Sequence, residues 1–278
     1  MMQRTIQGLP PSFHESFFPN RRHLATLLKL ADQRFEGTID SISAESGIPT
    51  GKSSGKVLPH LKYAHAMGLI GAPVPTNSLY TLQLTPLGRT FFAEDPLLHE
   101  PLTQLIMHLM LSRPIGGASA WHVLFGCSRL ALGFSASVVA ATAFLAQELG
   151  NSSAFPGPIF STYREEISLA RTGVLTVDKE TYVRQPLPSR PEYYWAFSYC
   201  LLTYWEQTSS EQQLSLADLE SYCGFLEVSG WNEKQVDGFL AWTVEQGITR
   251  VDRQTGTPLI MRIKRGDELI THIYSDLL

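Results

Sequence analysis

The chain has 278 residues, of which 44% are hydrophobic and 17% are charged, and its formal net charge is −4. This balance excludes an intrinsically disordered chain, and the negative charge argues against a protein that coats nucleic acid with its whole surface. No apolar run reaches the ~18–20 uncharged residues of a membrane-spanning helix, and the N-terminus lacks the apolar core of a secretory signal. Three widely spaced cysteines predict reduced thiols, a cytoplasmic location, and neither a metal site nor a cofactor.

The N-terminal third predicts an arm followed by helices. Residues 1–20 predict an irregular arm, because Pro10-Pro11 blocks a helix. A helix is expected over residues 21–35, where leucines recur at helical spacing behind a capping Asn20. A second, short helix is expected to start at Asp40 or Ser41 and to end at Gly47.

A third helix, a hairpin and a fourth helix are expected next. The third helix starts at a capping Ser53 or Ser54 and runs to Met67, and residues 69–70 and 79–84 read as two strands. Thr85-Pro86 opens the fourth helix. Three helices followed by a two-stranded wing predict a winged helix-turn-helix domain over residues 21–95.

The rest of the chain predicts a helical middle domain and a second winged-helix-like unit. Helices are expected over 101–111, 118–125, 135–149 and 158–171, which form a helical middle domain at 96–190. Ser135 has the position of an N-cap for the third of these helices, and Gly150-Asn151 that of a C-cap. The C-terminal unit, 191–278, predicts helices at 193–206, 215–222 and 232–246. The second of them has Ser215 as its cap, and the third, which starts at Asn232, is again capped. Strands at 248–252 and 258–264 are expected to flank a turn at 254–256. The predicted fold class is mainly α.

Gly47–Ser53 resembles the end of a phosphate-binding loop, but the pattern argues against one. Three residues, not four, separate the two glycines, and the preceding segment predicts a helix where such a loop follows a buried strand. A basic turn that opens a helix suits a DNA phosphate as well.

A locally basic segment indicates a DNA-binding patch on an acidic chain. No aspartate or glutamate lies between Glu45 and Glu94. The residues at the start of the third helix are those that meet the major groove in a winged helix. The predicted DNA contacts are Thr50, Lys52, Ser53, Ser54, Lys56, His60 and Lys62, with Arg250, Arg253 and Arg262 on the C-terminal wing.

The remaining histidines and carboxylates do not predict a catalytic or metal site. His99 and Glu100 are adjacent and do not share a helix face. His108 lies in an apolar helix and is expected to be a core histidine with one hydrogen bond. The aromatic run Tyr193–Trp205 could stack nucleic-acid bases, but a core helix is the favoured interpretation.

The succession from Leu84-Thr85-Pro86-Leu87-Gly88 onward resembles the bacterial domain-of-unknown-function family numbered four thousand and seven. Its motif residues here are His14, Glu15, Phe17, Gly88, Asp95, Glu100, His108 and Trp121. The resemblance implies a setting beside genes for DNA phosphorothioation and related phage defence. It implies no activity, because none is established for that family.

These observations predict a non-enzymatic, DNA-binding accessory protein of a DNA-modification or phage-defence system. The expected partners are double-stranded DNA and proteins of the same operon, without a membrane. One alternative is an assembly adaptor for a modification enzyme with no DNA binding of its own. Another is an enzyme with a site around His14, Glu15 and Glu100.

Overall fold

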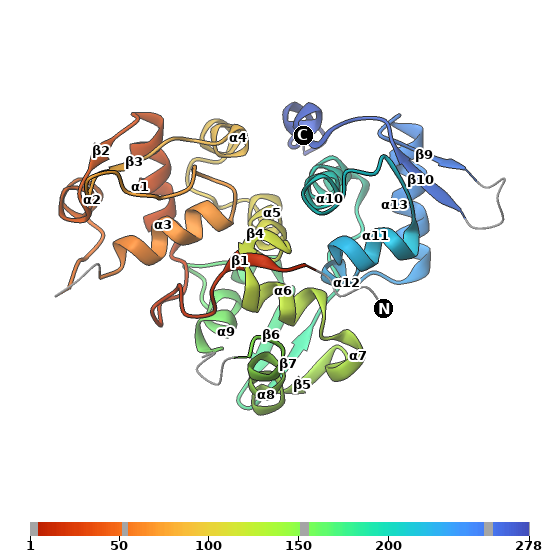
Figure 1. The fold of residues 1–278 in the computed structure, drawn as a ribbon, viewed down its shortest axis with the longest axis horizontal. Coiled ribbons are helices and arrows are strands. Elements are labelled where there is room, and N and C mark those ends of the chain that lie inside the picture. The colour runs from red at the N-terminus through yellow and green to blue at the C-terminus, as the bar shows by residue number, and fades with distance from the viewer. Residues whose placement is uncertain (1–4, 52–54, 151–155, 253–257, 278) are drawn as a thin grey trace.

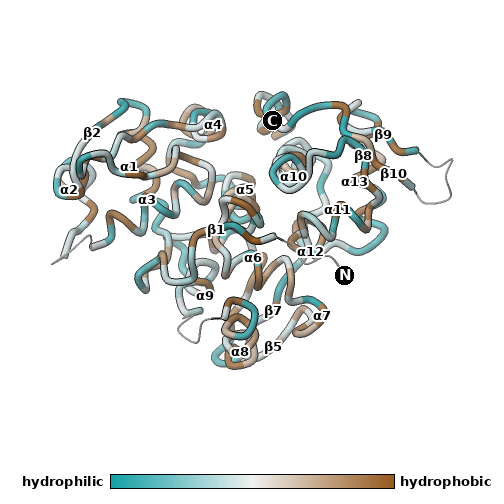
Figure 2. The backbone as a smooth tube through the Cα atoms, viewed as in Figure 1, coloured by the Kyte–Doolittle hydropathy of each residue, from teal (hydrophilic) through white to brown (hydrophobic). Residues whose placement is uncertain are grey.

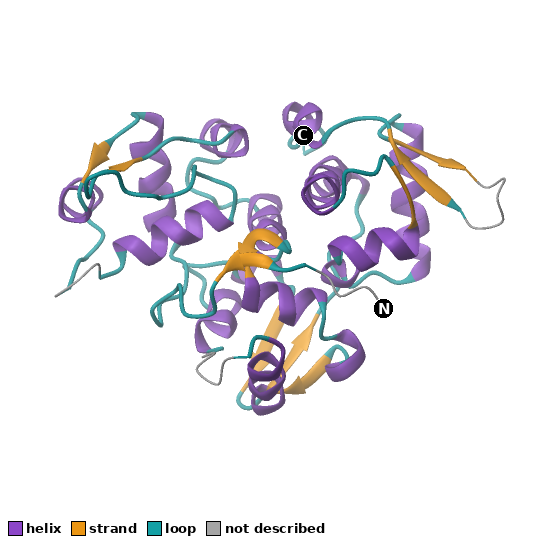
Figure 3. Cartoon of the chain, viewed as in Figure 1, coloured by secondary structure: helices purple, strands orange, loops and turns teal. Residues whose placement is uncertain are grey.

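Three lobes of helices and short strands surround a common centre in a computed structural model of the chain (Figure 1). The structure describes residues 5–51, 55–150, 156–252 and 258–277. The fold is mainly helical, as predicted, and each lobe carries a small set of strands (Figure 3). Within the described residues, no helix combines the length and apolarity needed to cross a membrane.

The N-terminal lobe follows the predicted order of helices. Its elements are β1 (Gln7–Leu9), α1 (Arg21–Asp32), β2 (Glu36–Gly37), α2 (Ile39–Ser46), α3 (Val57–Ala66), β3 (Tyr80–Thr81) and α4 (Pro86–Glu94). Asn20 and Thr85 cap α1 and α4, as predicted. Thr38 caps α2, so the prediction of Asp40 or Ser41 was wrong. The predicted cap of α3 at Ser53 or Ser54 lies outside the described residues, and the described helix begins at Val57.

The predicted N-terminal hairpin forms from short pairings. Ile70 bridges Leu84, and Thr76 bridges Leu79 nearer the tip. β3 pairs antiparallel with β2, so the segment 80–84 lies between the other two strand segments. Prolines 73 and 75 lack amide hydrogens, which accounts for the absence of longer described strands in this hairpin.

The middle lobe contains a sheet that the sequence analysis missed. Its elements are α5 (Pro101–Leu111), β4 (Ile115–Ala118), α6 (Ser119–Gly126), α7 (Arg129–Leu132), β5 (Ser135–Ser137), α8 (Val138–Glu148), α9 (Gly157–Arg164), η1 (Ala170–Thr172), β6 (Leu175–Asp178) and β7 (Thr181–Arg184). The expected purely helical domain is therefore corrected. Ser135 lies in β5, and Ser137 caps α8 in its place. The predicted C-cap of this helix at Gly150-Asn151 lies partly outside the described residues.

The C-terminal lobe matches its prediction closely. Its elements are η2 (Pro191–Tyr193), α10 (Tyr194–Thr208), β8 (Gln213–Ser215), α11 (Leu216–Cys223), α12 (Phe225–Ser229), α13 (Glu233–Glu245), β9 (Thr249–Asp252), β10 (Leu259–Arg262) and η3 (Gly266–His272). Ser215 caps α11, and Asn232 caps α13 through a capping box. The predicted turn at 254–256 lies outside the described residues.

The three lobes share one order of elements. The middle lobe from α6 onward and the C-terminal lobe each have a helix, a strand, two further helices and then two strands, with α7 and α12 as short additions. The N-terminal lobe has the same order, with the bridge of Ile70 to Leu84 in place of the first of the two final strands. The two three-stranded sheets have the orders β5-β7-β6 and β8-β10-β9, so the last strand is central in both. The segment 80–84 occupies the same central place in the N-terminal lobe. The chain therefore repeats one topology three times, whereas the sequence predicted two occurrences.

The N-terminal arm is ordered by pairing and by aromatic packing. β1 runs parallel to β4, with Gln7 opposite Ile115 and Leu9 opposite Ala118, so the arm, predicted to be irregular, contains one three-residue strand and is otherwise turn and loop where it is described. Phe13 is buried, with ring centroids 4.7 Å from Tyr63 on α3 and 5.9 Å from Trp121 on α6. The arm thus joins the N-terminal lobe to the middle lobe.

Helix α5 forms the centre of the molecule. Every residue from Leu102 to Leu111 is buried, and Figure 2 shows hydrophobic residues along this helix. It contacts α3, α10 and η1, which belong to different lobes. The Tyr204 hydroxyl on α10 donates to the carbonyl oxygen of Leu109, and the Tyr274 and Thr103 hydroxyl oxygens lie 2.6 Å apart.

Two buried arginines join separate parts of the chain through main-chain carbonyls. Arg21 at the start of α1 donates to the carbonyls of Ser168 (2.6 Å), Glu166 (2.5 Å) and Leu98 (3.3 Å). Arg184 at the end of β7 donates to the carbonyls at Phe125 (2.7 Å), Leu124 (3.2 Å) and Glu227 (2.9 Å). Because buried carbonyl oxygens need donors, each guanidinium ties several segments together.

Replacing Arg184 tests this joint. Arg184→Met removes the donors to three buried carbonyls, which together are worth about 3 kcal/mol of unfolding free energy. Denaturant unfolding of both proteins measures the loss. Arg164→Met is the matched control, because the Arg164 side chain is 58% exposed. An equal change in the two variants would contradict the role given to Arg184.

Candidate nucleic-acid interface

The start of α3 presents the predicted basic contacts only in part. Lys56 is the N-cap residue of α3, and its Nζ lies 5.6 Å from the centre of the Phe17 ring. Thr50 is half-buried in the preceding loop, and Lys52, Ser53 and Ser54 lie outside the described residues. Helix α2, not a strand, precedes this loop, which agrees with the rejection of a phosphate-binding loop.

Helix α3 exposes a narrow stripe. Seven of its residues are buried, among them Leu61, Tyr63 and Ala64. Leu58, Lys62 and His65 are half-buried and recur at helical spacing, so they lie along one edge of the helix. Contact with a ligand is therefore restricted to this edge and to the N-terminal end, where Lys56 and Lys62 supply positive charge.

His60 is a structural residue, and its assignment to the DNA interface was wrong. Its side chain is 1% exposed. Nδ1 lies 2.6 Å from the carbonyl oxygen of Lys56, and Nε2 accepts the backbone N–H of Asn20 at 3.1 Å. Burial lowers the pKa of His60 to about 4: the hydrogen bond to the Lys56 carbonyl offsets part of the effect of burial, and the charges of His23 and Lys56 add to it, so the ring is neutral at pH 7. The residue fixes the start of α1 against α3.

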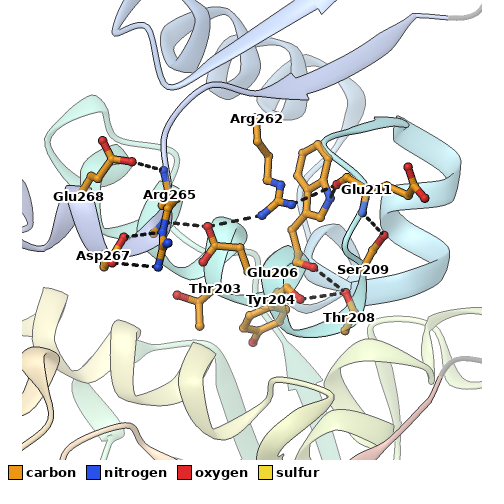
Figure 4. A network of polar contacts seen from close by, with 12 residues as sticks. Thr203, Tyr204, Glu206, Thr208, Ser209, Glu211, Arg262, Arg265, Asp267 and Glu268 are labelled. Carbon is orange, nitrogen blue, oxygen red and sulfur yellow. Dashed lines mark hydrogen bonds and ion pairs between the residues drawn. The ribbon is translucent and has the colours of Figure 1, made fainter.

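The predicted C-terminal contacts are not equivalent. Arg250 on β9 is exposed, and Arg253 lies outside the described residues. Arg262 on β10 pairs with Glu206 at 3.4 Å and donates to the carbonyl of Glu211 at 3.1 Å (Figure 4). Its guanidinium also lies 5.2 Å from the ring centre of Trp205. A phosphate would have to compete with these partners, so Arg250 is the freer cation of the two.

The exposed side of α13 is acidic. This helix occupies the place in the C-terminal lobe that α3 occupies in the N-terminal lobe. Its exposed charged residues are Glu233, Lys234, Asp237 and Glu245. Three carboxylates against one ammonium repel the phosphates of a duplex, so α13 is not suited to enter a DNA groove.

The motif residues near the arm belong to an aromatic cluster. The buried His14 ring lies 6.3 Å from Trp121, and Nδ1 of His14 accepts the backbone N–H of Ser16 at 3.1 Å. Burial lowers the pKa of His14 to about 4. Phe17 accepts the hydroxyl of Tyr63 at its carbonyl oxygen, and Glu15 is exposed in a turn with φ of 48°.

The motif residues after the hairpin have packing and capping roles. A Cβ atom on Gly88 would lie 1.9 Å from the carbonyl oxygen of Leu69, so only glycine fits there. The buried carboxylate of Asp95 accepts the backbone N–H groups of His99 (2.9 Å) and Glu100 (2.8 Å). Glu100 is exposed on this turn, near Tyr274, whereas His14 lies beside Trp121. His14, Glu15 and Glu100 therefore do not form one pocket.

His108 is a core histidine with one hydrogen bond, as predicted. Its Nδ1 lies 2.7 Å from the hydroxyl of Tyr163, and its ring packs 4.7 Å from Phe125. Burial lowers its pKa to about 3, so it is neutral at pH 7. Among the residues that the structure describes, no group of three or more His, Cys, Asp or Glu side chains is placed to hold a metal ion.

The structure adds an acidic, partly apolar face on the C-terminal lobe that the sequence analysis did not identify. The charges of α13 could have been read from the sequence, because Glu233 and Asp237 stand one turn apart and Glu245 follows about two turns later. The buried arginines carry no comparable signal. A lone arginine in a sequence does not show which distant carbonyls it will meet.

Comparisons with known proteins show the fold. No family model and no curated protein matches this chain. Two crystal structures of SspB are similar to it, one of them magnesium ion-bound, with TM-scores of 0.73 and 0.71. In both cases the identity is 15%, and the match covers 98% of this chain and 90% of SspB. The three-lobed arrangement is therefore shared with SspB over nearly the whole chain.

The neutral His60 predicts a loss of stability in acid. Its pKa is about 4 in the folded protein and near 6.5 in an unfolded chain, so the unfolded state binds the proton first as the pH falls. The stabilisation is complete above pH 6.5 and is lost as the pH falls toward 4. At pH 5 the loss from this residue is about 2 kcal/mol.

Unfolding free energies between pH 7 and 4.5 measure this dependence. His60→Gln keeps a polar side chain but removes the titrating ring, so its stability is expected to fall less steeply with acid than that of the parent. His99→Gln is the control, because His99 is exposed. Equal slopes for the parent and His60→Gln would contradict the assignment.

Proposed function

We propose that the protein is a non-enzymatic, DNA-binding accessory protein of a bacterial DNA-modification system of the phosphorothioation type or of a phage-defence system. The DNA-binding part of this proposal rests on the N-terminal lobe. Its order of helices and strand segments supports a winged helix-turn-helix unit, and a lysine stands at the N-terminal end of its third helix.

The contact surface of this proposal is the N-terminal end and free edge of α3. Lys56 and Lys62 neutralise backbone phosphates there, and Thr50 lies in the loop that precedes α3. Lys52 adds a third cation from the sequence. The stretch between Glu45 and Glu94 has no acidic residue, so no like charge opposes a phosphate within it. Binding is therefore electrostatic in large part and sensitive to salt.

The proposal has two further supports, one for its biological setting and one for its fold. The motif from Leu84 to Phe125 resembles a family found beside phosphorothioation and defence genes. The likeness to SspB extends over 98% of the chain at 15% identity, and it supports the three-lobed fold on which the proposal is built. Neither support identifies a reaction, and the proposal assigns none.

A second candidate function is an assembly adaptor that contacts a modification enzyme. The acidic exposed face of α13 favours this function, because its carboxylates suit a protein partner better than DNA. The two functions are compatible, because they use different lobes. In that case the N-terminal lobe contacts the duplex and the C-terminal lobe contacts protein.

Removing the two described lysines of α3 tests the DNA assignment. For Lys56→Ala combined with Lys62→Ala, we expect the affinity for a duplex to fall about tenfold or more at moderate salt. The slope of log K against log salt should become less negative by about 2, one for each lost phosphate contact. Fluorescence anisotropy at several salt concentrations measures both quantities.

The matched control is Lys29→Ala combined with Lys179→Ala, which removes the same charge from two exposed positions elsewhere. It should leave the slope within experimental error. Plain and phosphorothioated duplexes should give the same change in slope, because a lysine acts on phosphate as a point charge. An unchanged slope in the Lys56 and Lys62 variant would sink the assignment.

A further inference from the structure

An apolar groove crosses the C-terminal lobe on the side of α13. It has a volume of about 870 Å³ and lies between α11, α13 and the strands β9 and β10. All but three of its lining residues are apolar, among them Leu226, Leu240, Val244 and Val251. Val244 is 40% exposed, so this apolar surface is open to solvent.

The polar groups of the groove are mostly engaged. The hydroxyl of Ser215 caps α11 by accepting the Asp218 N–H at 3.0 Å. The carboxylate of Glu220 accepts the N–H groups of Leu226 (2.8 Å) and Glu227 (3.0 Å) at the start of α12. Asp237 is exposed on α13 and is the remaining carboxylate of the lining.

This chemistry selects the class of occupant. A phosphate-bearing ligand is disfavoured, because both charged residues lining the described groove are acidic and no lysine or arginine that the structure describes lines it. Small-molecule sites place several polar groups to orient the ligand, whereas the hydroxyl of Ser215 and the carboxylate of Glu220 are engaged in caps. A partner that contributes apolar area and one positive charge fits what remains.

We propose that this groove binds an amphipathic helix of a partner protein, with apolar side chains on the floor and a lysine or arginine opposite Asp237. The apolar lining residues come from two helices and a strand pair, and such a surface suits apolar anchors at positions i, i+3 or i+4, and i+7 of a helix. The proposal does not depend on DNA binding by the N-terminal lobe, because α3 and α13 belong to different lobes.

A charge exchange tests the orientation. The probe is a helical peptide with leucines at i, i+4 and i+7 and one lysine on the adjacent turn, together with its Lys→Glu version. The parent protein should prefer the lysine peptide about fivefold, and Asp237→Lys should reverse that preference. Val244→Arg should weaken both peptides about tenfold or more, because it places a charge on the apolar floor.

Glu245→Lys is the control, since it makes the same charge reversal on α13 at an exposed residue outside the groove lining. Circular dichroism of each variant checks the fold. Equal effects of Asp237→Lys and Glu245→Lys on the two peptides, or no saturable binding, would overturn the proposal. So would a concentration-dependent dimer that Val244→Arg abolishes, because the groove would then hold a second copy of this chain. Duplex affinity should stay unchanged in all three variants, which separates this test from that of the DNA interface.

Discussion

The arrangement of the lobes depends on buried guanidinium groups that donate to main-chain carbonyls. Arg21, Arg113 and Arg184 are each at most 7% exposed. Arg113 donates to the carbonyls of Ile115 and Gly116 beside the β1–β4 pair, and the other two join segments that are distant in the sequence. Burial lowers the pKa of all three side chains. Carbonyl oxygens compensate for that loss of hydration, and they do so only when several segments are in place together.

This constraint gives the two outer lobes fixed and different surfaces. In the N-terminal lobe, α3 is packed by α1, α2 and α5, so that its basic end and one edge remain for a ligand. In the C-terminal lobe, the equivalent helix α13 presents carboxylates and an apolar groove. The same topology thus presents a surface suited to phosphate in one lobe and a surface suited to a protein helix in the other. The difference between the two surfaces comes from their side chains, since the order of elements is the same in both lobes.

Local signals in the sequence predicted much of the fold. The caps at Asn20, Thr85, Ser215 and Asn232 and the long helices depend on neighbouring residues, and the structure has them where expected. The β1–β4 pair was missed because its strands are far apart in the chain, and the strands of the middle sheet are too short for a periodic pattern. For the site, the sequence identified Lys56 and Lys62 as candidates. It could not show that His60, on the same helix, faces α1, because helix packing decides which side is buried.

Hydrogen exchange of the whole chain with and without a duplex tests most directly whether the N-terminal lobe, and not the C-terminal lobe, binds DNA. We expect slower exchange at the loop before α3 and through the first turns of α3 when DNA is bound, and unchanged exchange in α13. Protection of α13 with none around Lys56 would contradict it, because the acidic lobe would then be the one that holds the duplex.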